Sequence, residues 1–128
     1  LQRITDSPFE LITAQHPSKE CAHIKRYLDS NYGENISLDH LSAISHQNKY
    51  YLSHEFTKYY GISPMNYLNR KRIEVCKELL ENTDYGISDI AHLTGFSSQS
   101  YLSQSFRKSC GMTAGTYRKL KKKRKDPI

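Results

Sequence analysis

Apolar residues recur at intervals of three and four along most of the chain, which is the period of α-helices that bury one face. The longest such stretch covers residues 64–82, where Ser63 can cap the helix and Pro64 suits its first turn. A second helix is predicted over residues 18–31, beginning at Ser18 and ending before Gly33. The apolar positions of these two helices are Met65, Leu68, Ile73, Cys76, Leu79 and Leu80, and Cys21, Ile24 and Leu28.

Part of the sequence occurs twice. Seven pairs are identical at a separation of 50 residues: Tyr51/Tyr101, Leu52/Leu102, Ser53/Ser103, Phe56/Phe106, Lys58/Lys108, Gly61/Gly111 and Tyr67/Tyr117. Upstream of Tyr51 the similarity continues at a separation of 49, with Leu38/Ile87, Leu41/Ile90, Ser42/Ala91 and Ile44/Leu93. A duplicated structural unit is therefore expected, with a difference of one residue in a connecting turn.

Each copy predicts a helix, a tight turn and a second helix. In the first copy Ser37 and Asn48 can cap the two helices, a turn falls at residues 45–47, and Gly61 ends the second helix, predicted over 48–59. In the second copy Gly95 supplies the turn, and Ser97 or Ser98 caps a helix over 98–108 that ends before Gly111. The inward residues of the second helices are Leu52, Phe56 and Tyr59, and Leu102 and Phe106. This is the helix-turn-helix pattern.

These elements predict an all-α protein of about seven helices, with two helix-turn-helix subdomains joined by a long connecting helix. Thr113 can cap a last short helix that contains Tyr117 and Leu120. We expect a linker, or the remnant of a missing effector domain, over 1–17, the first subdomain over 18–63, the connecting helix over 64–82, the second subdomain over 83–120 and a basic tail over 121–128. The tail carries too much like charge to pack and is expected to be mobile.

The formal net charge of +6 comes from the C-terminal end, because residues 1–117 carry 12 basic and 12 acidic side chains. Charge alone is therefore weak evidence for a nucleic-acid partner. The three cysteines suit neither a disulfide framework nor a metal site, and we interpret them as free thiols in a reducing cytosol. No apolar run is long enough to cross a bilayer, so no membrane partner is expected. The chain starts at Leu1 and is expected to be processed or part of a longer protein.

The sequence resembles the C-terminal DNA-binding domain of the AraC/XylS family of bacterial transcription regulators. The resemblance covers about residues 20–119 and is most specific in Ile87-Ser-Asp-Ile-Ala91, Gly95-Phe-Ser-Ser-Gln-Ser-Tyr-Leu-Ser103 and Phe106-Arg-Lys-Ser-Cys-Gly111. It implies seven homeodomain-like helices in two helix-turn-helix subdomains. The chain departs from the family at Ala114, where proline is common, and in having only about 17 residues before its first predicted helix.

Residues that meet DNA bases are expected on the outward faces of the second helices. With Leu52 and Phe56 inward, Tyr50, Ser53, His54 and Thr57 point outward, and with Leu102 and Phe106 inward, Ser100, Ser103, Gln104 and Arg107 do so. The base-facing positions that the family resemblance implies are Tyr50, Ser53, His54, Gln99, Ser100, Ser103 and Gln104. Glutamine can pair with adenine through two hydrogen bonds, and a tyrosine edge can meet a thymine methyl group.

Basic and polar side chains that border these helices are expected to hold phosphates. They are Lys49, Thr57, Lys58, Arg70, Arg72, Arg107 and Lys108. If about six phosphates are neutralised, the logarithm of the affinity should fall with the logarithm of the salt concentration at a slope near −5. Backbone amides at the starts of the helices near Ser37 and Ile87 can add contacts.

The leading hypothesis is a sequence-specific double-stranded DNA-binding transcription regulator, an activator that contacts RNA polymerase, in the bacterial cytoplasm and on the nucleoid. A spacer over 64–82 would be about 28 Å long, against about 34 Å between successive major grooves on one face of DNA. The alternatives are an architectural DNA-bending protein with little base readout and a helical protein-interaction module. No catalytic residue, metal ligand set or cofactor is predicted, because the sequence shows no nucleophile with a base, no carboxylate pair and no phosphate-cradling glycine loop.

Overall fold

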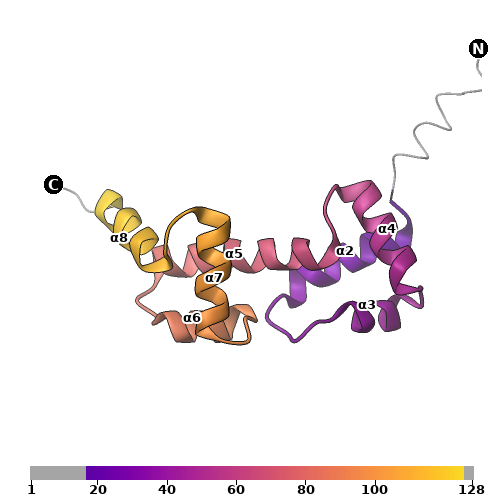
Figure 1. Cartoon of the computed structure of the whole chain (residues 1–128), viewed down its shortest axis with the longest axis horizontal. Helices are drawn as coiled ribbons and strands as arrows, with labels where there is room; N and C mark the ends of the chain where they lie inside the picture. Colours follow the sequence, from indigo (N-terminus) through magenta and orange to yellow (C-terminus); the bar gives the residue numbers. More distant parts are fainter. Residues whose placement is uncertain (1–16, 126–128) are drawn as a thin grey trace, which may run out of the picture. The chain divides into compact units, whose positions relative to one another are not determined.

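The computed structural model describes residues 17–125, which form seven helices and no strand (Figure 1). The linker predicted over 1–17 lies outside the described residues except for Pro17. The helices are α2 (Lys19–Asn31), α3 (Leu38–Ser45), α4 (Lys49–Tyr60), α5 (Pro64–Asn82), α6 (Ile87–Thr94), α7 (Gln99–Cys110) and α8 (Ala114–Lys125). The predicted all-α class with two helix-turn-helix pairs is confirmed.

The predicted caps account for the helix starts. The side chain of Ser37 accepts a hydrogen bond from the backbone of His40, and Asn48 accepts from the backbone of Tyr50. In the second copy Ser98, one of the two candidates, caps α7 by accepting from the backbone of Tyr101. These bonds satisfy backbone donors that the first turn of a helix leaves without an internal partner.

The two helix-turn-helix pairs turn at corresponding residues. His46 and Gly95 both adopt the left-handed conformation, with φ of 57° and 91°, and end α3 and α6. Both then donate their backbone N–H to the carbonyl four residues earlier, on Ser42 and Ala91 respectively. Ser97 is therefore the additional residue in the second copy, because Asn48 and Ser98 are equivalent caps.

The fold consists of two compact units, and α5 belongs to both. Residues 17–30 and 36–67 form the first unit, and residues 31–35 and 68–125 belong to the second. Only the first turn of α5 is therefore part of the first unit. The segment between α2 and α3, although flanked by helices of the first unit, belongs to the second, which differs from the division predicted from the sequence.

Each unit buries the helical stripes that the periodicity predicts. In the first unit the buried apolar residues are Cys21, Ile24, Leu28, Ile36, Leu41, Leu52 and Phe56. In the second unit one continuous core contains Ile73, Cys76, Leu80, Ile90, Ala91, Phe96, Leu102, Phe106 and Ala114. The thiol of Cys76 is part of this core, and burial raises its pKa to about 11.

Two of the repeated tyrosines are more exposed than the repeat pattern suggests. The repeat positions of Tyr51, Tyr67, Tyr101 and Tyr117 predict that these side chains pack in the core, but Tyr51 is 55% exposed and Tyr101 is 46% exposed. Tyr51 donates to the carboxylate of Glu55 at 3.4 Å, and the Tyr101 ring meets Phe96 edge-on. Both rings lie one position before the buried leucine of their helix, so they rest at the rim of the core.

The last helix is longer than predicted. The sequence predicts a short helix that contains Tyr117 and Leu120, but α8 continues to Lys125. Residues 126–128 of the predicted tail lie outside the described residues. The ammonium group of Lys121 lies 5.5 Å from the centre of the Tyr117 ring, and Lys122 forms an ion pair with Asp84. Arg118 donates to the carbonyl oxygens of Leu80 and Thr83 at the end of α5. These partners offset the like charge that had suggested an unpacked tail.

Candidate nucleic-acid interface

The second helix of each pair presents a polar face to solvent. In α4, Tyr50 is 74% exposed, His54 and Thr57 are exposed and Ser53 is partly exposed. In α7 the exposed predicted residues are Gln99, Ser100, Ser103, Gln104, Arg107 and Lys108. The opposite faces hold the buried pairs Leu52/Phe56 and Leu102/Phe106. Every side chain predicted to contact bases is therefore at least partly accessible within its own unit.

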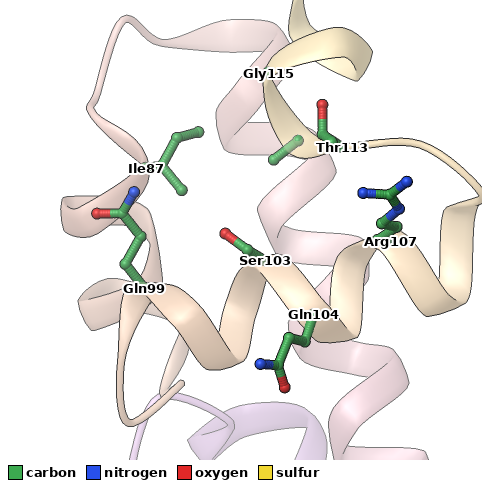
Figure 2. A pocket seen from close by; sticks show the side chains of 8 residues that line it. Ile87, Gln99, Ser103, Gln104, Arg107, Thr113 and Gly115 are labelled. Atoms are coloured by element: carbon green, nitrogen blue, oxygen red, sulfur yellow. The ribbon is translucent and has the colours of Figure 1, made fainter.

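Four of the residues predicted on α7 border one hollow in the second unit (Figure 2). Gln99, Ser103, Gln104 and Arg107 form its wall on α7, and its volume is about 270 Å³. Ile87, from the start of α6, lies across the hollow from Ser103 in Figure 2. In Figure 2 the side chains of Gln99, Ser103 and Arg107 extend toward the side of α7 that faces Ile87 and Thr113, whereas the Gln104 side chain extends the opposite way.

The start of α8 completes this hollow, which the pattern of residues along the chain does not predict. Thr113, Ala114 and Gly115 line it opposite α7, and Thr113 caps α8 by accepting from the backbone of Thr116 at 3.1 Å. A Cβ atom added to Gly115 would meet no other atom within 4 Å, so the glycine opens onto free space. Thr113 was predicted as a cap, but nothing in the one-dimensional pattern places it beside Arg107.

The first unit contains an ion pair at the start of its outward helix. The Nζ atom of Lys49 lies 3.2 Å from the Oδ1 atom of Asp39 and 5.7 Å from the centre of the Tyr50 ring. The hydrogen bond to Asp39 raises the pKa of the Lys49 ammonium group. Lys49 is thus a predicted phosphate contact that already has an acidic partner. The sequence pattern does not predict this ion pair.

Arg72 does not fit the predicted role of a phosphate contact. Only 9% of its surface is accessible, and its Nε and Nη2 atoms donate to the carbonyl oxygens of Tyr32 and Glu34, each at 2.7 Å. Burial lowers the pKa of the guanidinium group. Its position in α5 was predicted, but the partner segment lies about 40 residues away and could not be foreseen. The neighbouring Arg70 is exposed.

The remaining predicted phosphate contacts are on the surface. Thr57, Lys58, Arg107 and Lys108 are exposed on α4 and α7, and the Lys49 side chain is 41% exposed. The Nζ atom of Lys58 lies 5.5 Å from the centre of the Tyr59 ring. The charges of Lys58, Arg107 and Lys108 therefore lie at the surface of the two polar faces, whereas that of Lys49 is paired with Asp39.

The described residues 17–125 contain neither a metal-binding cluster nor a membrane-spanning helix. No group of three or more His, Cys, Asp and Glu side chains is arranged to hold a metal ion among them. None of their helices combines the length and the apolar character needed to span a bilayer.

Comparison with known proteins identifies the family. A family model described as a helix-turn-helix domain matches residues 41–120. The HTH-type transcriptional regulator YbfI of Bacillus subtilis is 39% identical over 92 residues, which cover 72% of this chain and 33% of YbfI. The bifunctional transcriptional activator and DNA repair enzyme AdaA, also of Bacillus subtilis, is 31% identical over 77% of this chain and 47% of AdaA. The chain thus spans a third to a half of the length of these relatives.

Solved structures share the same fold. The C-terminal domain of AraT, a response regulator from Geobacillus stearothermophilus, superimposes with a TM-score of 0.78 at 27% identity, covering 80% of this chain and 86% of that one. The DNA-binding domain of AdpA, solved in complex with a target DNA, has a TM-score of 0.81 at 24% identity, covering 84% and 97%. With the family model and these relatives, the chain belongs to the AraC/XylS family of helix-turn-helix transcription regulators.

Proposed function

We propose that the chain binds double-stranded DNA sequence-specifically as a transcription regulator, with α4 and α7 as its recognition helices. One observation carries this proposal: α4 and α7 have the same construction. Each is a capped helix that buries a Leu/Phe pair on one face and exposes polar side chains on the other. Family membership supports it, as does the DNA complex of AdpA. A helix-turn-helix reads the major groove with its second helix.

The proposed base contacts are Tyr50, Ser53, His54, Gln99, Ser100, Ser103 and Gln104. The proposed phosphate contacts are Lys49, Thr57, Lys58, Arg70, Arg107 and Lys108, without Arg72 because its donors are occupied by carbonyl oxygens. If the five cationic side chains of this set each neutralise one phosphate, the slope of log affinity against log salt should be about −4.5.

The two recognition helices are proposed to enter successive major grooves of one duplex. The support is α5, a single helix of 19 residues between the two pairs, whose length at 1.5 Å per residue is about 28 Å. Sites one helical turn apart are separated by about 34 Å. Selection of bound duplexes from a random pool should then recover two conserved blocks about 10 bp apart on one face of the DNA.

Competition titrations at fixed salt test the readout of sequence. A selected duplex should compete far better than random duplexes of equal length. Equal affinity would point instead to an architectural protein that bends DNA with little base readout. Absence of salt-dependent affinity after removal of residues 121–128 would favour a protein-interaction module. The truncation should otherwise weaken binding to all duplexes alike.

We further propose that the chain acts in a bacterial cytoplasm as an activator that contacts RNA polymerase, without catalytic activity of its own. The description of the relative AdaA as a transcriptional activator supports this role. Transcription in vitro with purified bacterial RNA polymerase and a template that carries the selected site tests it. A purely repressive effect would contradict it.

A further inference from the structure

The ion pair between Lys49 and Asp39 joins the start of α4 to the start of α3 in the first pair. Asp39 is the second residue of α3, and Lys49 is the first residue of α4, next to the proposed base contact Tyr50. The Asp39 side chain is 80% exposed and that of Lys49 is 41% exposed, so both groups face solvent while their charged atoms are 3.2 Å apart. A phosphate approaching Lys49 would therefore also approach the Asp39 carboxylate.

The second unit lacks this pair although it has the same architecture. α3 starts at Leu38 and α6 at Ile87, so the residue equivalent to Asp39 is Ser88. α4 starts at Lys49 and α7 at Gln99, so the ammonium group is replaced by an amide. The acidic and the basic residue are thus both particular to the first unit, and serine is the residue that the chain itself carries at the equivalent acidic position.

An exposed ion pair of this kind is weak. Such pairs stabilise a protein only slightly, because water screens the charges and two flexible side chains must be held in one geometry. A phosphate of DNA competes for the same ammonium group and releases counterions when it binds. DNA binding can therefore break the ion pair. The free energy needed to break it, together with the repulsion between Asp39 and the phosphate, reduces the affinity gained from the contact between Lys49 and the phosphate.

We propose that Asp39 limits the affinity of the first unit for DNA by competing with a backbone phosphate for the Lys49 ammonium group. This inference rests on the proposed DNA-binding function and assigns Asp39 a role in setting affinity and salt dependence. Asp39 is not one of the proposed base contacts. Its replacement should therefore alter the strength of binding to every duplex and leave the preferred sequence unchanged.

The test is a series of DNA titrations at several salt concentrations with the wild-type chain and Asp39→Ser. Replacement of the carboxylate should tighten binding at low salt by about two- to fivefold, which corresponds to the range for an exposed pair. Because Lys49 is then released fully to a phosphate, the slope of log affinity against log salt should become steeper, by up to about 0.9. The advantage should therefore shrink as the salt concentration rises.

Three controls separate this competition from a general charge effect. In a Lys49→Ala background Asp39→Ser should have no effect on the salt slope, because no ammonium group remains to be released. Asp89→Ser removes the same charge from the first turn of α6, where the described residues give Asp89 no ion pair, and should also leave the slope unchanged. Asp39→Asn, which keeps the shape of the side chain, should reproduce the gain if the serine variant folds poorly, as judged by circular dichroism.

The outcomes distinguish this inference from the function on which it rests. If the wild-type chain binds no duplex at any salt concentration, the proposed function fails and the inference fails with it. If the wild-type chain binds but both Asp39 variants have unchanged or weaker affinity, or if the gain persists without Lys49, only the inference is overturned. If both Asp39 variants bind more weakly, the ion pair serves to position Lys49.

Discussion

The Nε atom of Arg72 donates a hydrogen bond of 2.7 Å to the carbonyl oxygen of Tyr32, forty residues away in the sequence. Its Nη2 atom donates to the carbonyl oxygen of Glu34, also at 2.7 Å. One guanidinium group therefore holds the segment between α2 and α3 against α5. The planar guanidinium group presents several N–H donors in a fixed arrangement. It can therefore bind two carbonyl oxygens that belong to different peptide groups.

Replacing Arg72 with lysine should lower the free energy of unfolding by about 2 kcal/mol. A single ammonium group cannot reproduce both hydrogen bonds in their observed geometry, and a partly buried carbonyl that loses its partner costs roughly 1–3 kcal/mol. Urea unfolding of Arg72→Lys measures this, with Glu74→Gln at an exposed position of α5 as the control expected to change little. Unchanged stability would contradict the role of Arg72 as the donor that holds residues 31–35 against α5.

Gly95 should tolerate alanine far less well than Gly111, although both glycines end a helix in the left-handed conformation. A Cβ atom at Gly95 would lie 2.4 Å from the carbonyl oxygen of Tyr32 and 2.8 Å from the Nε atom of Arg72, whereas one at Gly111 would meet nothing within 4 Å. Gly111→Ala should cost only the conformational strain, about 1–2 kcal/mol. Gly95→Ala should cost at least about 2 kcal/mol more, because the backbone carbonyl cannot move away cheaply.

Thermal unfolding of the two glycine variants measures this difference. The melting temperature of Gly95→Ala should lie clearly below that of Gly111→Ala. Equal melting temperatures would show that the segment 31–35 does not pack as closely on Gly95 as the structure indicates.

Gln104 should contribute to the discrimination between base sequences in the part of the site that α7 reads. Its side chain is exposed on α7, and a glutamine paired with adenine through two bonds is worth roughly 1–3 kcal/mol of discrimination. Gln104→Ala should narrow the affinity ratio between the selected duplex and duplexes altered in one block. Competition titrations measure the ratio, with the exposed Ser109→Ala on the same helix as the control. An equal loss of affinity for all duplexes would contradict base readout by Gln104.

Stability should decline from pH 10 to pH 12 in part through Tyr117. Burial and the 2.6 Å hydrogen bond that its hydroxyl group donates to Glu81 raise the pKa of Tyr117 to about 12, against about 10 in an unfolded chain. The raised pKa disfavours the phenolate in the folded state, so this contribution is fully present below pH 10 and is lost as the pH rises toward 12.

The variant Tyr117→Phe should therefore lose stability less steeply above pH 10 than the wild-type chain. Urea unfolding at a series of pH values tests this. Between pH 6 and pH 9 the two stability curves should run parallel, with the variant lower by about 1 kcal/mol for the lost hydrogen bond. Identical slopes above pH 10 would show that the Tyr117 phenol is not held protonated by the fold.

Local hydrogen bonds and the period of apolar residues explain why the helices could be predicted from the sequence. Ser37 and Asn48 cap helices whose first turns lie within three residues of them, so the pattern contains both partners. The extent of α5 from Pro64 to Asn82 was predicted for the same reason. The outward faces of α4 and α7 follow from the buried positions of Leu52, Phe56, Leu102 and Phe106, which require only helical geometry.

Side chains whose partners lie far away in the sequence could not be predicted in this way. Lys122 lies in the part of α8 beyond the predicted helix and forms an ion pair with Asp84, 38 residues earlier. Such a contact forms only when segments far apart in the sequence pack together.

The sequence by itself determined the helices, their caps, the duplicated helix-turn-helix and the residues on its outward faces, because each depends on neighbours within one or two turns. Only the tertiary structure decided that Arg72 binds carbonyl oxygens, that Lys49 is held by Asp39 and that the start of α8 borders the α7 face. A long charged side chain takes the nearest partner of suitable charge or hydrogen-bonding capacity, and folding determines which partner that is.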